Sequence, residues 1–67
     1  MNESEKLGEN LKRIRTAKGI SQGEIGRILE VDKSFISNIE NGKANPTLDT
    51  IAKIAKAIGV SISELTK

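Results

Sequence analysis

The sequence contains no cysteine, no histidine, no tryptophan and no tyrosine. Without cysteine the chain forms no disulfide, and without cysteine or histidine it lacks the usual ligands of a structural zinc ion. A chain of 67 residues builds only a modest hydrophobic core, so its stability must come from tight helix packing or from oligomerisation. We therefore expect no metal site and no other cofactor.

Aromatic residues and long apolar runs are also scarce. Phe35 is the only aromatic residue, which argues against a platform that stacks single-stranded bases. No apolar run approaches the roughly 18 residues of a membrane span, and the polar, acidic start from Met1 to Glu5 is unlike a secretory signal. We expect a cytoplasmic protein with no membrane partner. An enzyme is not expected, because histidine, cysteine and a glycine-rich phosphate loop after a strand are all absent.

The net charge of +2 permits nucleic acid as a partner but does not require it. Many of the positive residues are concentrated early in the chain: Lys6, Lys12, Arg13, Arg15 and Lys18. A solvated helix face is the more common explanation of such a run.

Apolar periodicity and capping residues predict five helices and no strand, which is an all-α fold. The first helix repeats Leu7, Leu11 and Ile14 and ends before Gly19. The fourth follows the N-cap Thr47 and gathers its apolar residues on one face: Leu48, Ile51, Ile54, Ala55 and Ile58. A short fifth helix begins with a capping box formed by Ser61 and Glu64 and carries Ile62 and Leu65.

The second and third helices lie unusually close in the sequence. The second begins with a capping box formed by Ser21 and Glu24, and its apolar residues are Ile25, Ile28 and Leu29. The third follows the N-cap Asp32, turns Ile36 and Ile39 inward, and ends at Asn41 and Gly42.

Only Glu30 and Val31 separate the end of the second helix from Asp32. So short a link cannot fold two helices back antiparallel, and it predicts an angled helix-turn-helix over residues 21–41. We expect Val31 to fill the corner as a core residue. We expect Gly26 to allow a close approach of the next helix, since glycine in a helix costs about 1 kcal/mol relative to alanine. These patterns alone also fit any small helical bundle.

Most of the chain resembles the lambdoid repressor and Cro family of helix-turn-helix proteins. The resemblance runs from about Leu11 to Leu65 and is carried by Ile14-Arg15, Lys18-Gly19-Ile20-Ser21-Gln22, Glu24-Ile25, Val31, Ser34-Phe35-Ile36-Ser37-Asn38-Ile39-Glu40-Asn41-Gly42 and Pro46-Thr47-Leu48. It implies a compact five-helix bundle that forms a single DNA-binding domain over residues 1–67. It also implies a sequence-specific regulator of transcription, a repressor or an autoregulator, whose recognition helix, residues 33–41, enters the major groove of double-stranded DNA.

The resemblance further implies roles for individual residues. Those matching positions that contact bases are Lys33, Ser34, Asn38 and, through sugar or a thymine methyl group, Phe35. Those matching positions that contact phosphates are Gln22, Ser21, Asn41 and Lys43, the last two in a loop that holds phosphate through backbone and side chain. Arg15 and Glu40 match a partly buried ion pair. The alternatives are an ordinary first-turn polar residue for Ser34, an exposed helix residue for Asn38, a core residue for Phe35 and a phosphate contact for Arg15.

The chain departs from the family pattern in two respects. Glu30 stands where the turn usually has glycine, so it must adopt a left-handed conformation or a different turn. The recognition helix is also poor in arginine and glutamine, the usual bidentate readers of guanine and adenine. We therefore expect modest specificity per half-site, with a larger share of phosphate contacts and of DNA shape readout.

One recognition helix reads too few bases to select a site in a genome. We therefore expect a homodimer on a pseudo-palindromic operator with half-sites about 34 Å apart. The expected dimer interface is the apolar patch formed by Ile58, Val60, Ile62 and Leu65, for which core packing is the alternative. Because the chain ends at Lys67, we expect neither a small-molecule effector domain nor the extension of an antitoxin. A controller of a restriction-modification system would use the same biochemistry.

Overall fold

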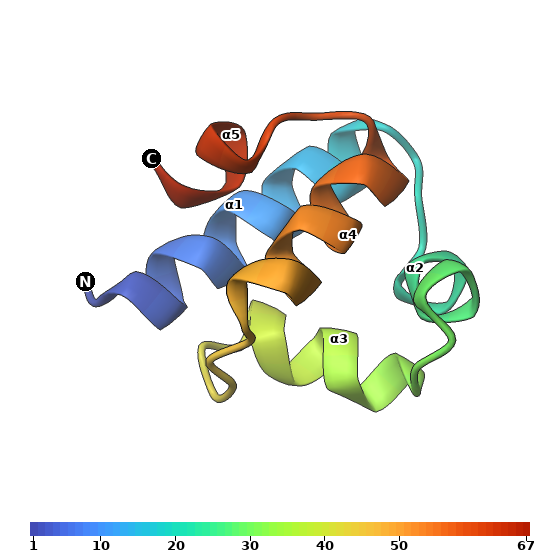
Figure 1. Cartoon of the computed structure of the whole chain (residues 1–67), viewed down its shortest axis with the longest axis horizontal. Helices are drawn as coiled ribbons and strands as arrows, with labels where there is room; N and C mark the ends of the chain where they lie inside the picture. The colour runs from blue at the N-terminus through green and yellow to red at the C-terminus, as the bar shows by residue number, and fades with distance from the viewer.

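The computed structural model describes all residues from Met1 to Lys67 and contains five helices and no strand. The helices are α1 (Glu3–Ala17), α2 (Gln22–Leu29), α3 (Lys33–Glu40), α4 (Leu48–Ile58) and α5 (Ile62–Thr66). α3 packs on α1 and α2, α2 packs on α4, and α5 packs on α1 and α4. In Figure 1, α3 forms the lower edge of the molecule and α5 lies at the opposite edge. The predicted all-α, five-helix fold is confirmed.

All five helices contribute to one hydrophobic core. Its buried members are Leu7, Leu11, Ile14, Ile25, Ile36, Ile39, Ile54, Ala55, Ile58 and Leu65. The apolar faces predicted for α1 and α3 are therefore the buried faces. Because α3 is held by two core isoleucines and lies against α1 and α2, the direction of its outer side is fixed by the packing of the bundle.

Three apolar residues predicted to be buried lie at the surface instead. Ile28 is 60% exposed, Leu48 is 67% exposed and Val31 is 37% exposed. The buried side of the short α2 is centred on Ile25 and Gly26, which leaves Ile28 at its flank. Leu48 is the first residue of α4, whose buried residues begin at Ile54, so it lies beyond the packed part of that helix.

The turn between α2 and α3 is closed by backbone atoms and not by the side chain of Val31. A Cβ atom on Gly26 would lie 2.9 Å from the Val31 carbonyl oxygen, and the Val31 N–H donates to the Gly26 carbonyl over 2.9 Å. The predicted close approach at Gly26 is thus confirmed, whereas the core position of Val31 is wrong. Glu30 adopts the left-handed conformation, with φ 60° and ψ 43°.

The predicted N-caps are present, with two differences. Ser21 and Glu24 form the complete capping box, and the backbone N–H that Glu24 accepts from Ser21 lowers the pKa of the Glu24 carboxyl. Ser61 accepts from the Glu64 N–H over 3.3 Å, but the return bond of the second predicted box is not formed. Asp32 has the backbone conformation of an N-cap, yet its side chain makes no capping hydrogen bond.

None of the five helices combines the length and the apolar character needed to cross a bilayer.

Candidate nucleic-acid interface

Three of the four residues predicted to contact bases lie on the outer side of α3. Lys33, Ser34 and Asn38 are exposed, and Ser34 and Asn38 share one face because they are four residues apart in a helix. Phe35 is half-buried and packs against the core, so only part of its ring is accessible. No other helix lies beyond α3 at the lower edge of the molecule (Figure 1). The outer side of α3 is therefore a polar surface on a rigidly packed helix.

A buried ion pair ties α3 to α1. Arg15 donates to both carboxylate oxygens of Glu40, from Nε over 2.6 Å and from Nη2 over 2.9 Å. The side chains are only 12% and 3% exposed, and the Arg15 Nη1 also donates to the Ile20 carbonyl over 3.1 Å. Hydrogen bonding to Glu40 raises the pKa of Arg15 above its ordinary value, against the opposing effect of burial. The predicted ion pair is present, and Arg15 is thus a tie between helices.

Gln22 takes part in the same network, a contact that no local sequence pattern indicates. Its Nε2 donates to the Glu40 Oε1 over 2.9 Å. Because a carboxylate only accepts hydrogen bonds, the amide group must turn its NH₂ toward Glu40. The Gln22 side chain therefore lies across the start of α2, with its position fixed by the end of α3.

A polar depression of about 420 Å³ lies at the start of α2. It is lined by Arg15, Ser21, Gln22, Gly23 and Lys33. The first N–H groups of a helix have no partner within it, and Ser21 satisfies only that of Glu24. The N–H groups of Gln22 and Gly23 thus remain at a helix N-terminus, beside cationic side chains, in an arrangement that suits a phosphate.

The loop after α3 offers fewer backbone donors than expected. The N–H of Asn41 donates to Ser37, that of Gly42 to Ile39 and that of Lys43 to Asn38, all within the end of α3. Because these three N–H groups already donate within the chain, the side chains of this loop are the better candidates for a phosphate contact. The side chains of Asn41 and Lys43 are exposed and remain available.

The residues expected at a dimer interface do not form one surface patch. Ile58 is 2% exposed and Leu65 is 0% exposed, and both belong to the core of the monomer. The expectation is wrong for these two residues, because a single small bundle needs both of them to close its core. Val60 is half-buried and Ile62 is 37% exposed.

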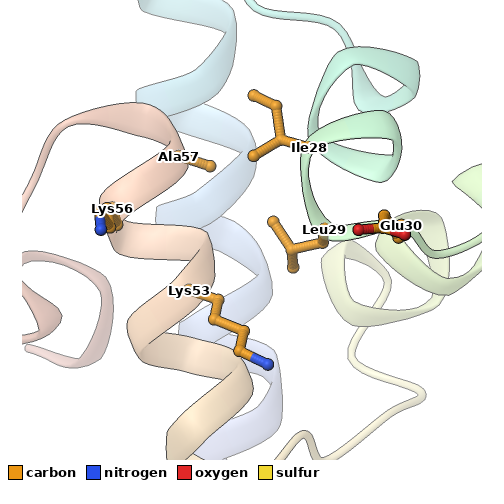
Figure 2. A pocket seen from close by; sticks show the side chains of 6 residues that line it. All are labelled: Ile28, Leu29, Glu30, Lys53, Lys56 and Ala57. Carbon is orange, nitrogen blue, oxygen red and sulfur yellow. The ribbon is translucent and has the colours of Figure 1, made fainter.

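A second hollow lies away from the outer side of α3, between α2 and α4. It has a volume of about 600 Å³ and is lined by Ile28, Leu29, Glu30, Lys53, Lys56 and Ala57. Figure 2 shows Ile28 and Leu29 on one side and Ala57 and Lys53 on the other. Its lining is therefore half apolar (Ile28, Leu29 and Ala57) and half charged (Glu30, Lys53 and Lys56).

Comparison with known proteins agrees with this description. Residues 11–65 match the family model described as Helix-turn-helix. The HTH-type transcriptional regulator y4dJ of Sinorhizobium fredii is 37% identical over 59 residues, which are 88% of this chain and 77% of that protein.

Solved structures share the fold over almost the whole chain. The restriction-modification controller protein C.AhdI from Aeromonas hydrophila is 35% identical and superimposes with a TM-score of 0.87 over 92% of this chain and 94% of that one. The controller protein C.Esp1396I, solved as a tetramer in complex with its natural 35 base-pair operator, is 28% identical with a TM-score of 0.82 and coverage of 100% and 99%. The chain belongs to the Helix-turn-helix family of transcriptional regulators.

Proposed function

We propose that this protein is a sequence-specific regulator of transcription that inserts α3 into the major groove of a double-stranded DNA operator. The observation that carries the proposal is the exposed polar side of α3, on which Lys33, Ser34 and Asn38 project from a helix fixed by the core and by the Arg15–Glu40 pair. Amide, hydroxyl and ammonium groups in this position are suited to the hydrogen-bonding edges of bases. Phe35 presents part of its ring to sugar or to a thymine methyl group.

Two groups of phosphate contacts would hold α3 in register. One is the depression at the start of α2, where Ser21, Gln22 and free backbone N–H groups gather. The other consists of the Asn41 and Lys43 side chains just beyond the end of α3. Since these two groups lie at different ends of the helix-turn-helix, they would grip the backbone on both sides of the groove. Such contacts position the protein but do not read sequence.

The active species in this proposal is a homodimer on a pseudo-palindromic operator, because one such module buries too little DNA to be selective. The operator-bound tetramer of C.Esp1396I supports assembly on DNA. Regulation would be repression or autoregulation in the cytoplasm, without a catalytic step. Two of the similar structures are restriction-modification controllers, so a role as the controller of a restriction-modification system is the first to test.

The proposal is tested by measuring DNA binding over a range of salt concentrations, after selection of a preferred site from random double-stranded DNA. Lys43→Ala should weaken binding to all sequences about equally and reduce the salt slope by about one unit, because it removes one phosphate contact. Asn38→Ala should instead reduce the preference at one base position, by roughly 1–3 kcal/mol.

Lys67→Ala serves as the charge-matched control, because Lys67 pairs with Glu64 on α5, at the opposite edge from α3. Its salt slope should stay that of the wild type. Failure of the wild-type protein to enrich any sequence would reject the proposed function, and unchanged preferences in Asn38→Ala would reject the role of that residue.

A further inference from the structure

The N-cap of α3 differs from the other four N-caps of the molecule. The four others each accept a hydrogen bond from the N–H three residues on: Asn2 from Glu5, Ser21 from Glu24, Thr47 from Thr50 and Ser61 from Glu64. Asp32 makes no such bond with its side chain. The N–H of Phe35, which would be its partner, donates over 2.9 Å to the Asp32 backbone carbonyl. The Asp32 carboxylate is therefore not used for capping.

The same carboxylate has no other partner in the structure. Asp32 is exposed, and it takes part in none of the four ion pairs, although Lys33 follows it directly. The residues after it are Lys33 and Ser34, two of the residues on the outer side of α3. A free acceptor group thus stands at the N-terminal end of the helix that the proposed function places in the major groove.

The position and the chemistry of this group define what it can recognise. In helix-turn-helix complexes the N-terminal residues of the recognition helix contact base edges. A carboxylate only accepts hydrogen bonds. In the major groove cytosine presents only an amino donor at N4, whereas adenine presents an acceptor at N7 beside its N6 donor, guanine presents acceptors at N7 and O6, and thymine presents one at O4. A carboxylate there favours cytosine, which offers a donor and no acceptor, and is repelled by the acceptors of adenine, guanine and thymine.

We infer that Asp32 is a specificity-determining residue that selects cytosine at one position of each half-site. This inference rests on the proposed function, since it requires α3 in the major groove. The negative charge also lies close to phosphates, so Asp32 reduces the affinity for DNA in general. It contributes specificity by rejecting wrong sequences, in contrast to Lys43, which would strengthen binding to every sequence.

Two substitutions separate this role from a role in helix stability. Serine is as good an N-cap as aspartate, so Asp32→Ser removes the charge while the start of α3 is kept. Asparagine is also a good N-cap and has nearly the same shape, but its amide matches the N6 and N7 groups of adenine. Glu64→Gln removes one negative charge from α5 and serves as the control for net charge, because α5 packs on α1 and α4 and lies at the opposite edge of the molecule from α3 (Figure 1).

The experiment selects sites from a random double-stranded DNA library with the wild type, Asp32→Ser, Asp32→Asn and Glu64→Gln, after thermal unfolding has shown that each variant folds. The wild type should prefer cytosine at one position of the half-site on the order of tenfold. Asp32→Ser should lose that preference and bind non-cognate DNA more tightly than the wild type. Asp32→Asn should change the preference at the same position to adenine, and Glu64→Gln should select the wild-type site.

The outcomes separate this inference from the proposed function. If the wild type and Asp32→Ser select the same site with the same preferences, Asp32 does not read a base, and the proposed function stands. If Asp32→Ser weakens binding to all sequences equally, the carboxylate acts only through the helix, and the inference is again overturned. If the wild type selects no site at all, the proposed function fails and the inference fails with it.

Discussion

Glu30 is the only residue other than glycine with a positive φ. The left-handed conformation costs an L-residue roughly 1–2 kcal/mol, whereas glycine adopts it without this steric penalty. Replacing Glu30 by glycine would relieve this steric cost. Part of the stabilisation would be lost again, because glycine also makes the unfolded chain more flexible. Glu30→Gly should therefore raise the free energy of unfolding by about 0.5–1 kcal/mol and raise the Tm by a few degrees.

Thermal unfolding followed by circular dichroism tests this expectation. Glu30→Ala is the matched control, because alanine also lacks the charge but retains a Cβ atom, and it should bring little or no stabilisation. A Tm for Glu30→Gly equal to or below that of the wild type would show that the turn is not strained at this residue.

The Arg15–Glu40 pair is the second residue-scale feature with a measurable consequence. Both side chains are almost fully buried, and Glu40 accepts hydrogen bonds from Arg15 and from Gln22. Removing one partner leaves a buried charge without its counterion, which should cost on the order of 3 kcal/mol. Arg15→Met and Glu40→Gln should each show such a loss, and the double variant should lose less than the sum.

The measurement is the free energy of unfolding in urea for the wild type, both single variants and the double variant. Lys53→Met with Asp49→Asn provides a control cycle, since that pair is 66% and 80% exposed and should couple by no more than about 0.5 kcal/mol. Strict additivity at Arg15 and Glu40 would contradict a buried, mutually dependent pair.

At the scale of elements, local signals predicted the helices well and their packing less well. The capping box of Ser21 and the short link before Asp32 are read within a few residues of sequence, so the helix-turn-helix could be placed without a structure. Ile28 and Val31 were misplaced, because whether an apolar residue is buried depends on which neighbour its helix meets. That information is not local.

Gly8 is a second case in which non-local packing decides the role of a residue, because no sequence pattern indicated that glycine is needed there. A Cβ atom there would overlap the Ile39 carbonyl oxygen and would lie 2.6 Å from that of Glu40. Gly8 therefore lets α1 cross the end of α3 in close contact, a requirement that only the tertiary structure reveals. A glycine inside a helix is otherwise unfavourable.

Gly8→Ala tests which effect dominates at this crossing. Helix propensity alone would stabilise the variant by about 1 kcal/mol, whereas the overlap with backbone oxygens forces α1 and α3 apart, which costs about 1–3 kcal/mol. We expect net destabilisation in urea unfolding. Gly23→Ala is the control, because a Cβ atom there meets only side-chain atoms at 3.7 Å or more, and it should be neutral or stabilising. A stabilised Gly8→Ala would mean that the contact is looser than described.

At the scale of the whole molecule, the fold and the outer side of α3 were predictable and the surface around them was not. Lys33, Ser34 and Asn38 are polar residues in a helix with an apolar inner side, so their exposure follows from periodicity. The bond from Gln22 to Glu40 joins residues 18 positions apart, and no local pattern contains it. The expected dimer patch failed for a related reason, because sequence alone does not say how many apolar residues one small core needs.

The remaining exposed apolar surface sets the last prediction, which concerns assembly. Of the four expected interface residues, only Val60 and Ile62 have solvent-accessible side chains. A dimer formed there would have a small interface, and we expect it to be weak in solution. It should therefore form mainly on DNA, with binding to a complete two-half-site operator rising steeply with protein concentration.

Ile62→Asp should lower the affinity for that operator while leaving the affinity for a single half-site unchanged. Ile28→Asp, at the 60% exposed Ile28 of α2, is the control and should leave cooperativity intact. Sedimentation analysis that finds one protein chain per complete operator at saturating concentration would rule out the dimer.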